Sequence, residues 1–329
     1  MEENQLFYEY FGDWFELFKK AEVKPVTARK YLEAQEAIKE LAPNLRLNQM
    51  NRMQVQKLIV AYGKTHEIAT AKGFFHMIRA CLQNAQYDEI IPKDPTFKLK
   101  ASSQKEHKVT RAKYLERKQA EYLSRVLRKD DSVASDLFDF DMRTGLRFAE
   151  LLGLTPEDIN RENKTIKINK SWLYKNGSKA DFGETKNIFS HREIKIDDFS
   201  LRLISKYSNK CSSNEPMFVK ALSNEKGFKS TKKQKYASIY NSTMNRKLTK
   251  MCKEAHVPRI GIHGLRHTHA SLMFNAGVSI LSISKRLGHA NTTTTEKVYV
   301  HLIQDQAEKD NRKMMSALNT LGEESDDSQ

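Results

Sequence analysis

Three short, widely separated segments of the sequence concentrate arginine, histidine and hydroxyl-bearing side chains. They are TGLRFAEL at 144–151, HGLRHTHA at 263–270 and LGH at 287–289, and Tyr299 follows the last of these by ten residues. Lys186 lies between the first two segments, in the stretch GETKNIFSHREI. Together these residue types could bind and react with a single phosphodiester.

Two arginines, Arg147 and Arg266, suit a phosphodiester because a planar guanidinium donates two hydrogen bonds to non-bridging oxygens and never loses its charge. Such a pair would match the charge on the equatorial oxygens in the transition state of phosphoryl transfer. A nearby tyrosine could then attack phosphorus and form a covalent intermediate. Because a phenol ordinarily has a pKa of about 10, it would need cationic neighbours to react near neutral pH. Tyr299 is the candidate because of its spacing from His289.

Each segment alone also has an ordinary structural interpretation. An arginine after TGL can lie on a helix surface, and a histidine of HxxRH can pack in a core. The chain has 12 tyrosines, and any one of them is normally part of the packing. His263, His267 and His269 could suggest zinc, but Gly264 stands where the metalloprotease motif HExxH needs glutamate. The sequence has no GxxxxGKS loop and no GxGxxG after a predicted strand. The combination and order of the segments therefore favour phosphodiester chemistry.

The first 100 residues are predicted to form a small helical bundle. Phe7, Phe11, Trp14 and Phe18 recur at intervals of four, three and four, which predicts a helix with a buried aromatic face. Three further helices are expected, one from an N-cap at Thr27 to about Pro43, one over 55–59 and one from about Thr70. Residues 1–100 therefore indicate a bundle of about four helices.

The rest of the chain mixes helix and strand. We expect a helix over 137–154, alternating strands at 165–168 and 192–196, and helices from about Tyr240 to about Leu321. The stretch 101–118 has six basic and two acidic residues, and its first part, 101–112, is predicted to be an interdomain linker that either binds DNA or is merely solvated. The acidic residues 322–329 are predicted to be a disordered tail.

The formal net charge of the 329 residues is +15 and the sequence pI is about 9.5, which a polyanionic partner would explain. Residues 1–100 are nearly balanced, with 15 Lys or Arg against 13 Asp or Glu, so most of the excess lies later in the chain. No run approaches the roughly 18 apolar residues of a membrane span. The acidic N-terminus has no signal-peptide features, and three isolated cysteines suit a reducing cytoplasm rather than a disulfide framework or a cysteine zinc site.

The sequence resembles the tyrosine recombinase (phage integrase) family through an ordered set of motifs, which are TGLRFAEL, a hairpin TK, HGLRHTHA, LGH and EKVYVH. Within that family it is most similar to integrases of Gram-positive phages, integrative conjugative elements and conjugative transposons. The aromatic first helix and VTARKYLEAQEAIKEL resemble the family's core-binding domain. The resemblance implies a mainly α fold with a small β-hairpin or sheet, comprising a SAM-like helical domain over 1–100 and a mixed α/β catalytic domain over 113–321.

The resemblance also assigns roles to the residues of the motifs. Arg147 and Arg266 would clamp the scissile phosphate, and His289 would donate a hydrogen bond to it. Lys186, on the hairpin, would protonate the leaving 5′ oxygen. Tyr299 would be the nucleophile and would form a 3′-phosphotyrosyl link.

Three further residues would support this chemistry. His263 would act as an acid–base partner or a phosphate ligand. Glu150 would hold the first segment together, as carboxylates orient buried cations. His267 occupies a less strict position, so its role could be catalytic or structural. The resemblance implies that the reaction uses neither metal nor ATP, because the tyrosyl ester keeps the energy of the cut strand.

The implied function is that of a site-specific recombinase that integrates and excises a mobile element in the bacterial cytoplasm. Its partners would be duplex DNA at core attachment sites, an excisionase accessory protein and three further copies in a homotetramer assembled by exchange of C-terminal helices. A resolvase, a chromosome-dimer recombinase and a type IB topoisomerase-like enzyme share the chemistry, whereas a DNA-binding regulator would lack it. Many such integrases have an N-terminal arm-binding domain, which either is absent from this protein or has been lost from this chain.

Overall fold

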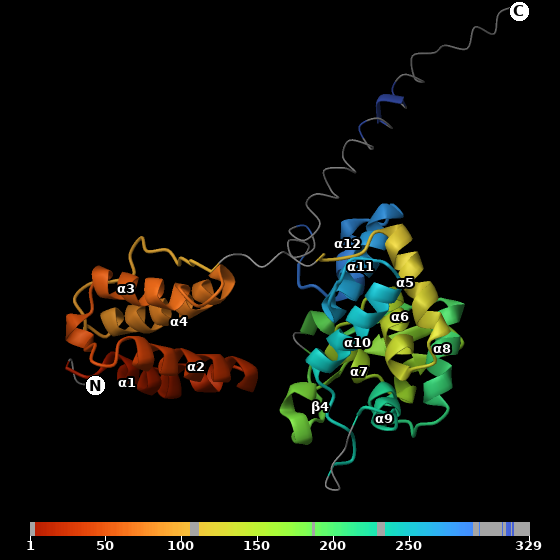
Figure 1. The fold of residues 1–329 in the computed structure, drawn as a ribbon, viewed down its shortest axis with the longest axis horizontal. Coiled ribbons are helices and arrows are strands. Elements are labelled where there is room, and N and C mark those ends of the chain that lie inside the picture. The colour runs from red at the N-terminus through yellow and green to blue at the C-terminus, as the bar shows by residue number, and fades with distance from the viewer. Residues whose placement is uncertain are drawn as a thin grey trace, which may run out of the picture. The chain divides into compact units, whose positions relative to one another are not determined.

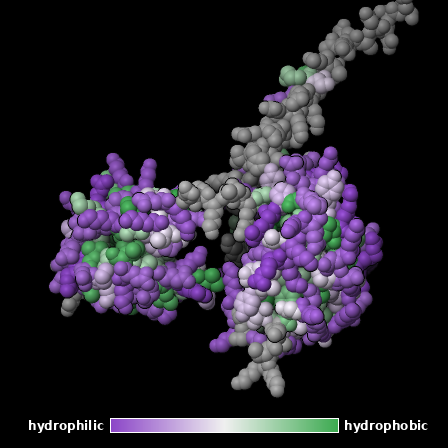
Figure 2. All heavy atoms as spheres, viewed as in Figure 1, coloured by the Kyte–Doolittle hydropathy of each residue, from purple (hydrophilic) through white to green (hydrophobic). Residues whose placement is uncertain are grey.

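The structure is a computed structural model that describes residues 4–105, 112–185, 188–228 and 234–291, together with 296, 311, 314–316 and 318. The chain divides into two compact units, Met1–Val109 and Thr110–Gln329 (Figure 1). Each unit has its own hydrophobic core. Among the described residues, no helix combines the length and apolar character needed to cross a membrane. In the view of Figure 2, the surface of each unit is mainly hydrophilic.

The N-terminal unit is built from four α-helices. These are α1 (Phe7–Trp14), α2 (Pro25–Leu41), α3 (Arg52–Gly63) and α4 (Ile68–Tyr87), with a π-helical turn at Phe15–Lys19 and short 3-10 turns at Lys20–Glu22 and Leu47–Gln49. Helix α2 begins with Pro25, and Lys24 is its N-cap residue, so the prediction that Thr27 is the N-cap is wrong. Proline suits this first helical position because its missing N–H would be unpaired there anyway.

The predicted aromatic face is buried at Phe7, Phe11 and Trp14, but Phe18 is 44% exposed. The reason is the π-helical turn at Phe15–Lys19, which has more residues per turn than an α-helix and so rotates the following side chains. Phe15 takes the core position instead and is 1% exposed. The prediction for Phe18 is therefore wrong.

The second unit is mainly helical. Its helices are α5 (Arg117–Lys129), α6 (Val133–Thr144), α7 (Phe148–Leu152), α8 (Asp198–Ser208), α9 (Met217–Ser223), α10 (Asn241–Glu254), α11 (Ile262–Asn275) and α12 (Ile280–Leu287). The helix predicted over 137–154 is divided, because Gly145 has a φ of 68° and ends α6 in the left-handed conformation. Arg147 is then the N-cap residue of α7. This break gives Arg147 its position between two helices.

The described part of this unit also contains two small antiparallel sheets. One has the order β1–β2–β5, formed by Ile159–Asn160, Thr165–Ile168 and Arg192–Lys195, and the other pairs β3 (Ser171–Trp172) with β4 (Phe182–Gly183). In the register of β2 and β5, Ile166 lies opposite Ile194, and both are buried. The predicted strands at 165–168 and 192–196 correspond to β2 and β5. The mainly α fold with small sheets is confirmed.

Candidate active site

Arg147 is held by contacts from three parts of the second unit. Its Nη1 donates to Glu150 Oε1 at 2.6 Å and to Ser190 Oγ at 3.0 Å, and its Nη2 donates to the Gly288 carbonyl at 2.7 Å. Its backbone N–H donates to Glu150 Oε2 at 3.1 Å, so the N3 carboxylate of α7 accepts from the N-cap residue as in one half of a capping box. The guanidinium therefore lies where α7, the 188–190 turn and the end of α12 meet.

Arg266, on α11, is only 2% exposed. Its Nη1 donates to the Gly145 carbonyl at 2.7 Å, and its Nη2 lies 2.6 Å from the Leu287 carbonyl and 2.9 Å from His289 Nε2. Burial, followed by repulsion from Arg147, lowers its pKa to about 9, so it remains charged at neutral pH. The ends of α6 and α12 thus supply the carbonyls that hold this buried cation.

A third arginine completes the cluster. Arg192 Nε donates to the Arg286 carbonyl at 2.6 Å. Three consecutive carbonyls at the end of α12, those of residues 286, 287 and 288, therefore accept hydrogen bonds from Arg192, Arg266 and Arg147 respectively. The last carbonyls of a helix have no partner within the helix and carry the negative end of its dipole, which favours cations.

Glu150 joins two of these arginines. Its Oε1 accepts from Arg147, and its Oε2 accepts from Arg192 Nη2 at 2.9 Å. Burial would raise the pKa of this carboxyl, but the attraction of Arg192 and Arg147 outweighs burial and lowers it. Glu150 is therefore an ionised, buried bridge between two cations.

His289 follows the glycine that ends α12 and contacts Arg266. Because a guanidinium can only donate, His289 Nε2 accepts this hydrogen bond, which places the proton of the neutral ring on Nδ1. Burial, followed by repulsion from Arg266 and Arg147, lowers its pKa to about 4. His289 is therefore a neutral ring at physiological pH.

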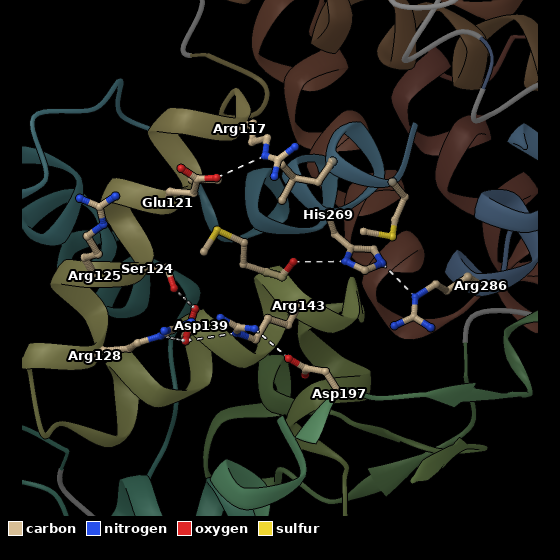
Figure 3. A pocket seen from close by; sticks show the side chains of 14 residues that line it. Arg117, Glu121, Ser124, Arg125, Arg128, Asp139, Arg143, Asp197, His269 and Arg286 are labelled. Carbon is tan, nitrogen blue, oxygen red and sulfur yellow. Dashed lines mark hydrogen bonds and ion pairs between the residues drawn. The ribbon is translucent and has the colours of Figure 1, made fainter. Parts of the chain in front are cut away.

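The three histidines of HGLRHTHA do not form one cluster. The rings of His263 and His267 meet edge to face with centroids 4.5 Å apart. His269 comes two residues after His267, about 200° around the helix. Its Nδ1 contacts the Met142 carbonyl at 3.2 Å, and its Nε2 accepts from Arg286 at 2.9 Å (Figure 3). Among the described residues, no group of three or more His, Cys, Asp or Glu side chains is arranged to hold a metal ion.

Burial lowers the pKa of His267 and of His269. His267 has a pKa of about 4, with His263 and Arg266 as further causes, and His269 has a pKa of about 3, with repulsion from Arg286 as the next cause. His263 is exposed. His269 lines a cavity of about 540 Å³ beside α5 and α6 together with Arg143 and Arg286 (Figure 3).

The residues singled out from the sequence thus divide into three groups. Arg147, Glu150, Arg266 and His289 lie in one continuous network of hydrogen bonds. His263 and His267 form a ring pair on α11, the helix that carries Arg266. Lys186 and Tyr299 lie outside the described residues.

Sequence reasoning missed Arg192 and Ser190. A signal for Arg192 was present, because in the alternating stretch REIKI it is in phase with Ile194 and Ile196, which face the core. A charged side chain on the inward face of a strand needs a buried partner. Ser190 Oγ, which accepts from Arg147, had no comparable signal.

Comparisons with known proteins identify relatives of this chain. The profile of the phage integrase family matches residues 113–306, more than half of the chain. The integrase of Staphylococcus phage L54a is 32% identical over 185 residues, covering 54% of this chain and 49% of that protein. The ICEBs1 integrase of Bacillus subtilis is 31% identical over 166 residues, covering 48% and 42%. The chain thus spans about half the length of these curated relatives.

Solved structures share the fold. The Tn1549 transposon integrase in complex with a circular intermediate DNA superposes with a TM-score of 0.75 at 19% identity, covering 93% of this chain and 98% of that one. A lambda integrase dimer bound to a core site gives 0.65 at 14% identity, covering 90% and 77%. With the family profile matched and both arginines of its motifs joined at the end of α12, the chain belongs to the phage integrase family of tyrosine recombinases.

Proposed function

We propose that this protein is a site-specific DNA recombinase, an integrase that cuts and rejoins DNA to integrate and excise a mobile element. The observation that carries the proposal is the convergence of Arg147 and Arg266 on the end of α12, beside the neutral ring of His289. Two fixed guanidinium groups at one point suit the clamping of a single phosphate.

A count of donors supports this role. A guanidinium has five N–H groups. Within the described residues, the contacts of Arg147 occupy both hydrogens of Nη1 and one of Nη2, and those of Arg266 occupy one of Nη1 and both of Nη2. In the described part of the chain, each arginine therefore keeps its Nε hydrogen and one Nη hydrogen, so each can still donate to a phosphate oxygen. In Arg266 both Nη2 hydrogens are occupied, so its two remaining N–H groups donate separately and not as one bidentate edge.

The proposed reaction is a transesterification. The oxygen of Tyr299 attacks phosphorus, the bond from phosphorus to the 5′ oxygen breaks, and a 3′-phosphotyrosyl ester forms. His263 takes the tyrosine proton and Lys186 supplies a proton to the 5′ oxygen. Glu150 orients Arg147, and His267 has a structural role beside Arg266. Attack by a free 5′ hydroxyl then reverses these steps and rejoins the strand without metal or ATP.

The partner we propose is duplex DNA at core attachment sites. Residues 1–100 would bind the core site, 101–112 would be the linker, 113–321 would carry the chemistry and 322–329 would be an acidic tail. The net charge of +15 suits binding to phosphates with strong salt dependence. A lambda integrase tetramer bound to a Holliday junction has been solved, and its fold is similar. We propose a homotetramer with exchanged C-terminal helices for this chain too, acting with an excisionase in the bacterial cytoplasm.

The test uses a nicked suicide substrate that carries the attachment core found by sequencing the DNA beside the gene. The wild type should give a covalent protein–DNA band on denaturing electrophoresis in EDTA. Tyr299→Phe should give no band but should bind DNA normally, whereas the exposed Tyr240 serves as a control, and Tyr240→Phe should behave as wild type. A Tyr299→Phe variant that still forms the band, or a requirement for added divalent metal, would contradict the proposed site.

The same assays separate the alternatives. A DNA-binding regulator would bind the site without forming a covalent band. A type IB topoisomerase-like enzyme would relax supercoiled DNA without pairing two sites. A resolvase or chromosome-dimer recombinase would act on two sites in one molecule, whereas an integrase would also join sites on two separate molecules.

A further inference from the structure

We propose that Arg192 is a positioning residue for recombination, which holds Arg147 and the end of α12 in the geometry that receives the scissile phosphate. The inference rests on the proposed function, because it concerns the same reaction. Arg192 lies on β5, outside the three motifs that carry the candidate catalytic residues.

All three nitrogens of the Arg192 side chain are used, and each reaches a different segment. Nε donates to the Arg286 carbonyl at 2.6 Å, Nη1 to the Ser190 carbonyl at 2.8 Å and Nη2 to Glu150 Oε2 at 2.9 Å. The side chain is 7% exposed. A guanidinium in this position fixes α12, the 188–190 turn and α7 relative to one another, which a flexible ammonium cannot do.

Glu150 transmits this effect to Arg147. Oε1 accepts from the guanidinium of Arg147, and Oε2 accepts from the guanidinium of Arg192 and from the backbone N–H of Arg147. Without Arg192, Oε2 would lose its charged partner, and Arg147 could turn toward both oxygens to form a bidentate pair. That movement would draw Arg147 away from Ser190 Oγ and the Gly288 carbonyl, which now fix its direction.

Arg192 also sets the charge of the site. Arg147, Arg192 and Arg266 carry three positive charges against the single negative charge of Glu150. Without Arg192, Glu150 would neutralise Arg147 alone, and the attraction for a phosphate would fall. Since the transition state of phosphoryl transfer carries its charge on the phosphate oxygens, this loss would slow cleavage more than it would weaken binding of the DNA duplex.

Arg192 packs closely against the glycine that ends α12. A Cβ atom on Gly288 would lie 2.8 Å from Arg192 Nη1 and 3.2 Å from the Phe189 carbonyl. A second contact joins the same two elements in the opposite direction, because Arg286 Nη1 donates to the Lys195 carbonyl at 3.0 Å. Strand β5 and the end of α12 are thus joined twice, and Arg192 is the link that faces Glu150.

The experiment is a double-mutant cycle between Arg192 and Arg147, with single-turnover cleavage of the suicide substrate as the readout. We expect Arg192→Gln and Arg192→Lys to cleave about 10²-fold more slowly than wild type, because a displacement of about 1 Å at a reacting group costs that much. Binding of the intact duplex should change by no more than a few-fold. Arg147→Gln/Arg192→Gln should be only a few-fold slower than Arg147→Gln, because the positioning effect acts through the Arg147 side chain and only the loss of the Arg192 charge remains.

Arg161→Gln is the matched control. Arg161 also joins two elements, donating from Nη2 to Ser208 Oγ at 2.9 Å and to Asn209 Oδ1 at 2.7 Å, but none of its partners belongs to the arginine cluster. It should lower the melting temperature without changing the cleavage rate of bound DNA. Arg192→Lys keeps the charge, so it reports on positioning even if Arg192→Gln fails to fold.

Two outcomes would overturn the inference. One is a cleavage rate for Arg192→Lys within a few-fold of wild type. The other is a double variant whose fold-reduction in cleavage rate equals the product of the fold-reductions in the two single variants. Failure of the proposed function is distinguishable, because the wild type would then form no covalent product, and a misplaced site would show as Arg147→Gln cleaving at the wild-type rate. A substrate with a neutral methylphosphonate at the scissile position adds a second readout. The deficits of Arg147→Gln and Arg192→Gln should both shrink on it, whereas a folding defect would persist.

Discussion

The interior of Met1–Val109 is aromatic and aliphatic, whereas the interior of Thr110–Gln329 also contains charges. Phe7, Tyr10, Phe11 and Trp14 are fully buried in the first unit, and Thr96 is the one fully buried side chain of polar type among its described residues. The second unit buries a larger set, which includes the hydrogen-bonded Asp139, Glu150, Arg266 and His269. Since burying a charge is costly unless it is paired, the second unit depends on its hydrogen bonds in a way that the first does not.

Two helix ends illustrate how the second unit makes such burial tolerable. Helices α6 and α12 each end at a left-handed glycine, with φ of 68° at Gly145 and 67° at Gly288. The carbonyl of Gly145 accepts from Arg266, and that of Gly288 accepts from Arg147. In this unit, main-chain carbonyls at helix ends thus stabilise arginines that would otherwise need carboxylate partners.

The strongest test of this difference is to replace the two arginines that bind the helix ends by lysine, which keeps their charge but not the planar guanidinium. Arg147→Lys and Arg266→Lys should each slow single-turnover cleavage by about 10²–10³-fold, because an ammonium cannot bind the helix-end carbonyls and the phosphate in the same geometry. Cleavage rates at saturating protein and affinities from gel shifts would be compared with wild type. A variant within a few-fold of the wild-type rate would show that its arginine lies outside the site.

The second test of the comparison is the pH at which the buried histidines of the second unit become protonated. His269 and His289, with pKa values of about 3 and about 4, should remain neutral at pH 5.5, although an ordinary histidine with a pKa of about 6.5 would be protonated. Ring chemical shifts measured by NMR from pH 4 to 8 would report this directly. The same rings should titrate near pH 6.5 in urea, and titration near 6.5 in the folded protein would refute the expectation.

The sign of the effect on stability follows from these values. Between pH 6.5 and about 4, the unfolded chain binds protons at these rings that the folded protein does not bind. The histidines therefore contribute stability that is complete above pH 6.5 and is lost as the pH falls through this range. Asp141 acts in the opposite direction, because burial raises its pKa well above the usual value and its charged form is disfavoured in the fold.

Gly288 tests whether the helix end itself is required. Gly288→Ala should destabilise the protein by about 1–3 kcal/mol through its left-handed backbone and should also slow cleavage, because the added Cβ would lie 2.8 Å from Arg192 Nη1. Gly277→Ala is the control, since its φ is +83° but no atom lies within 4 Å of the added Cβ. Denaturant unfolding should show a loss of stability for both variants, whereas the cleavage assay should show a slower rate for Gly288→Ala alone. Equal cleavage by the two variants would contradict this view.

The smallest expected effect is the change in stability when one tyrosine hydroxyl is removed from each unit. Tyr10 is fully buried, and its hydroxyl has no hydrogen-bond partner among the described residues, so Tyr10→Phe should be neutral or stabilising by up to about 1 kcal/mol. The hydroxyl of Tyr207 donates to Asp136, so Tyr207→Phe should destabilise by about 1–2 kcal/mol. Chemical denaturation would measure both, and a larger loss for Tyr10→Phe than for Tyr207→Phe would reverse the comparison.

The sequence motifs located much of the site, because Arg147, Arg266 and His289 come together as their segments suggested. Alternation predicted β2 and β5 for a simple physical reason: a half-buried strand exposes every second residue. The carbonyls of 286–288 could not be predicted, since a main-chain acceptor leaves no mark on residue type. Arg192 was predictable in principle from its phase with Ile194, but identifying its partner required the fold.

Other misses have local causes. A helix over 137–154 is a reasonable interpretation of apolar spacing, but the left-handed Gly145 divides it and gives Arg147 its place. The π-helical turn at Phe15–Lys19 changes the periodicity on which the aromatic pattern depended, so Phe18 faces outward. In both places one local backbone conformation overrides a pattern that holds on either side of it.

The three carbonyls at the end of α12 also determine which kinds of mutation the helix can accept. No change of side chain removes a main-chain acceptor, so exposed positions such as Leu281 and Lys285 should tolerate most residues. Adding or deleting one residue is different, because it turns the end of the helix by about 100° and shifts it by about 1.5 Å, which carries all three acceptors away from their arginines together. Among functional descendants of this sequence, α12 should therefore vary in composition but keep its length.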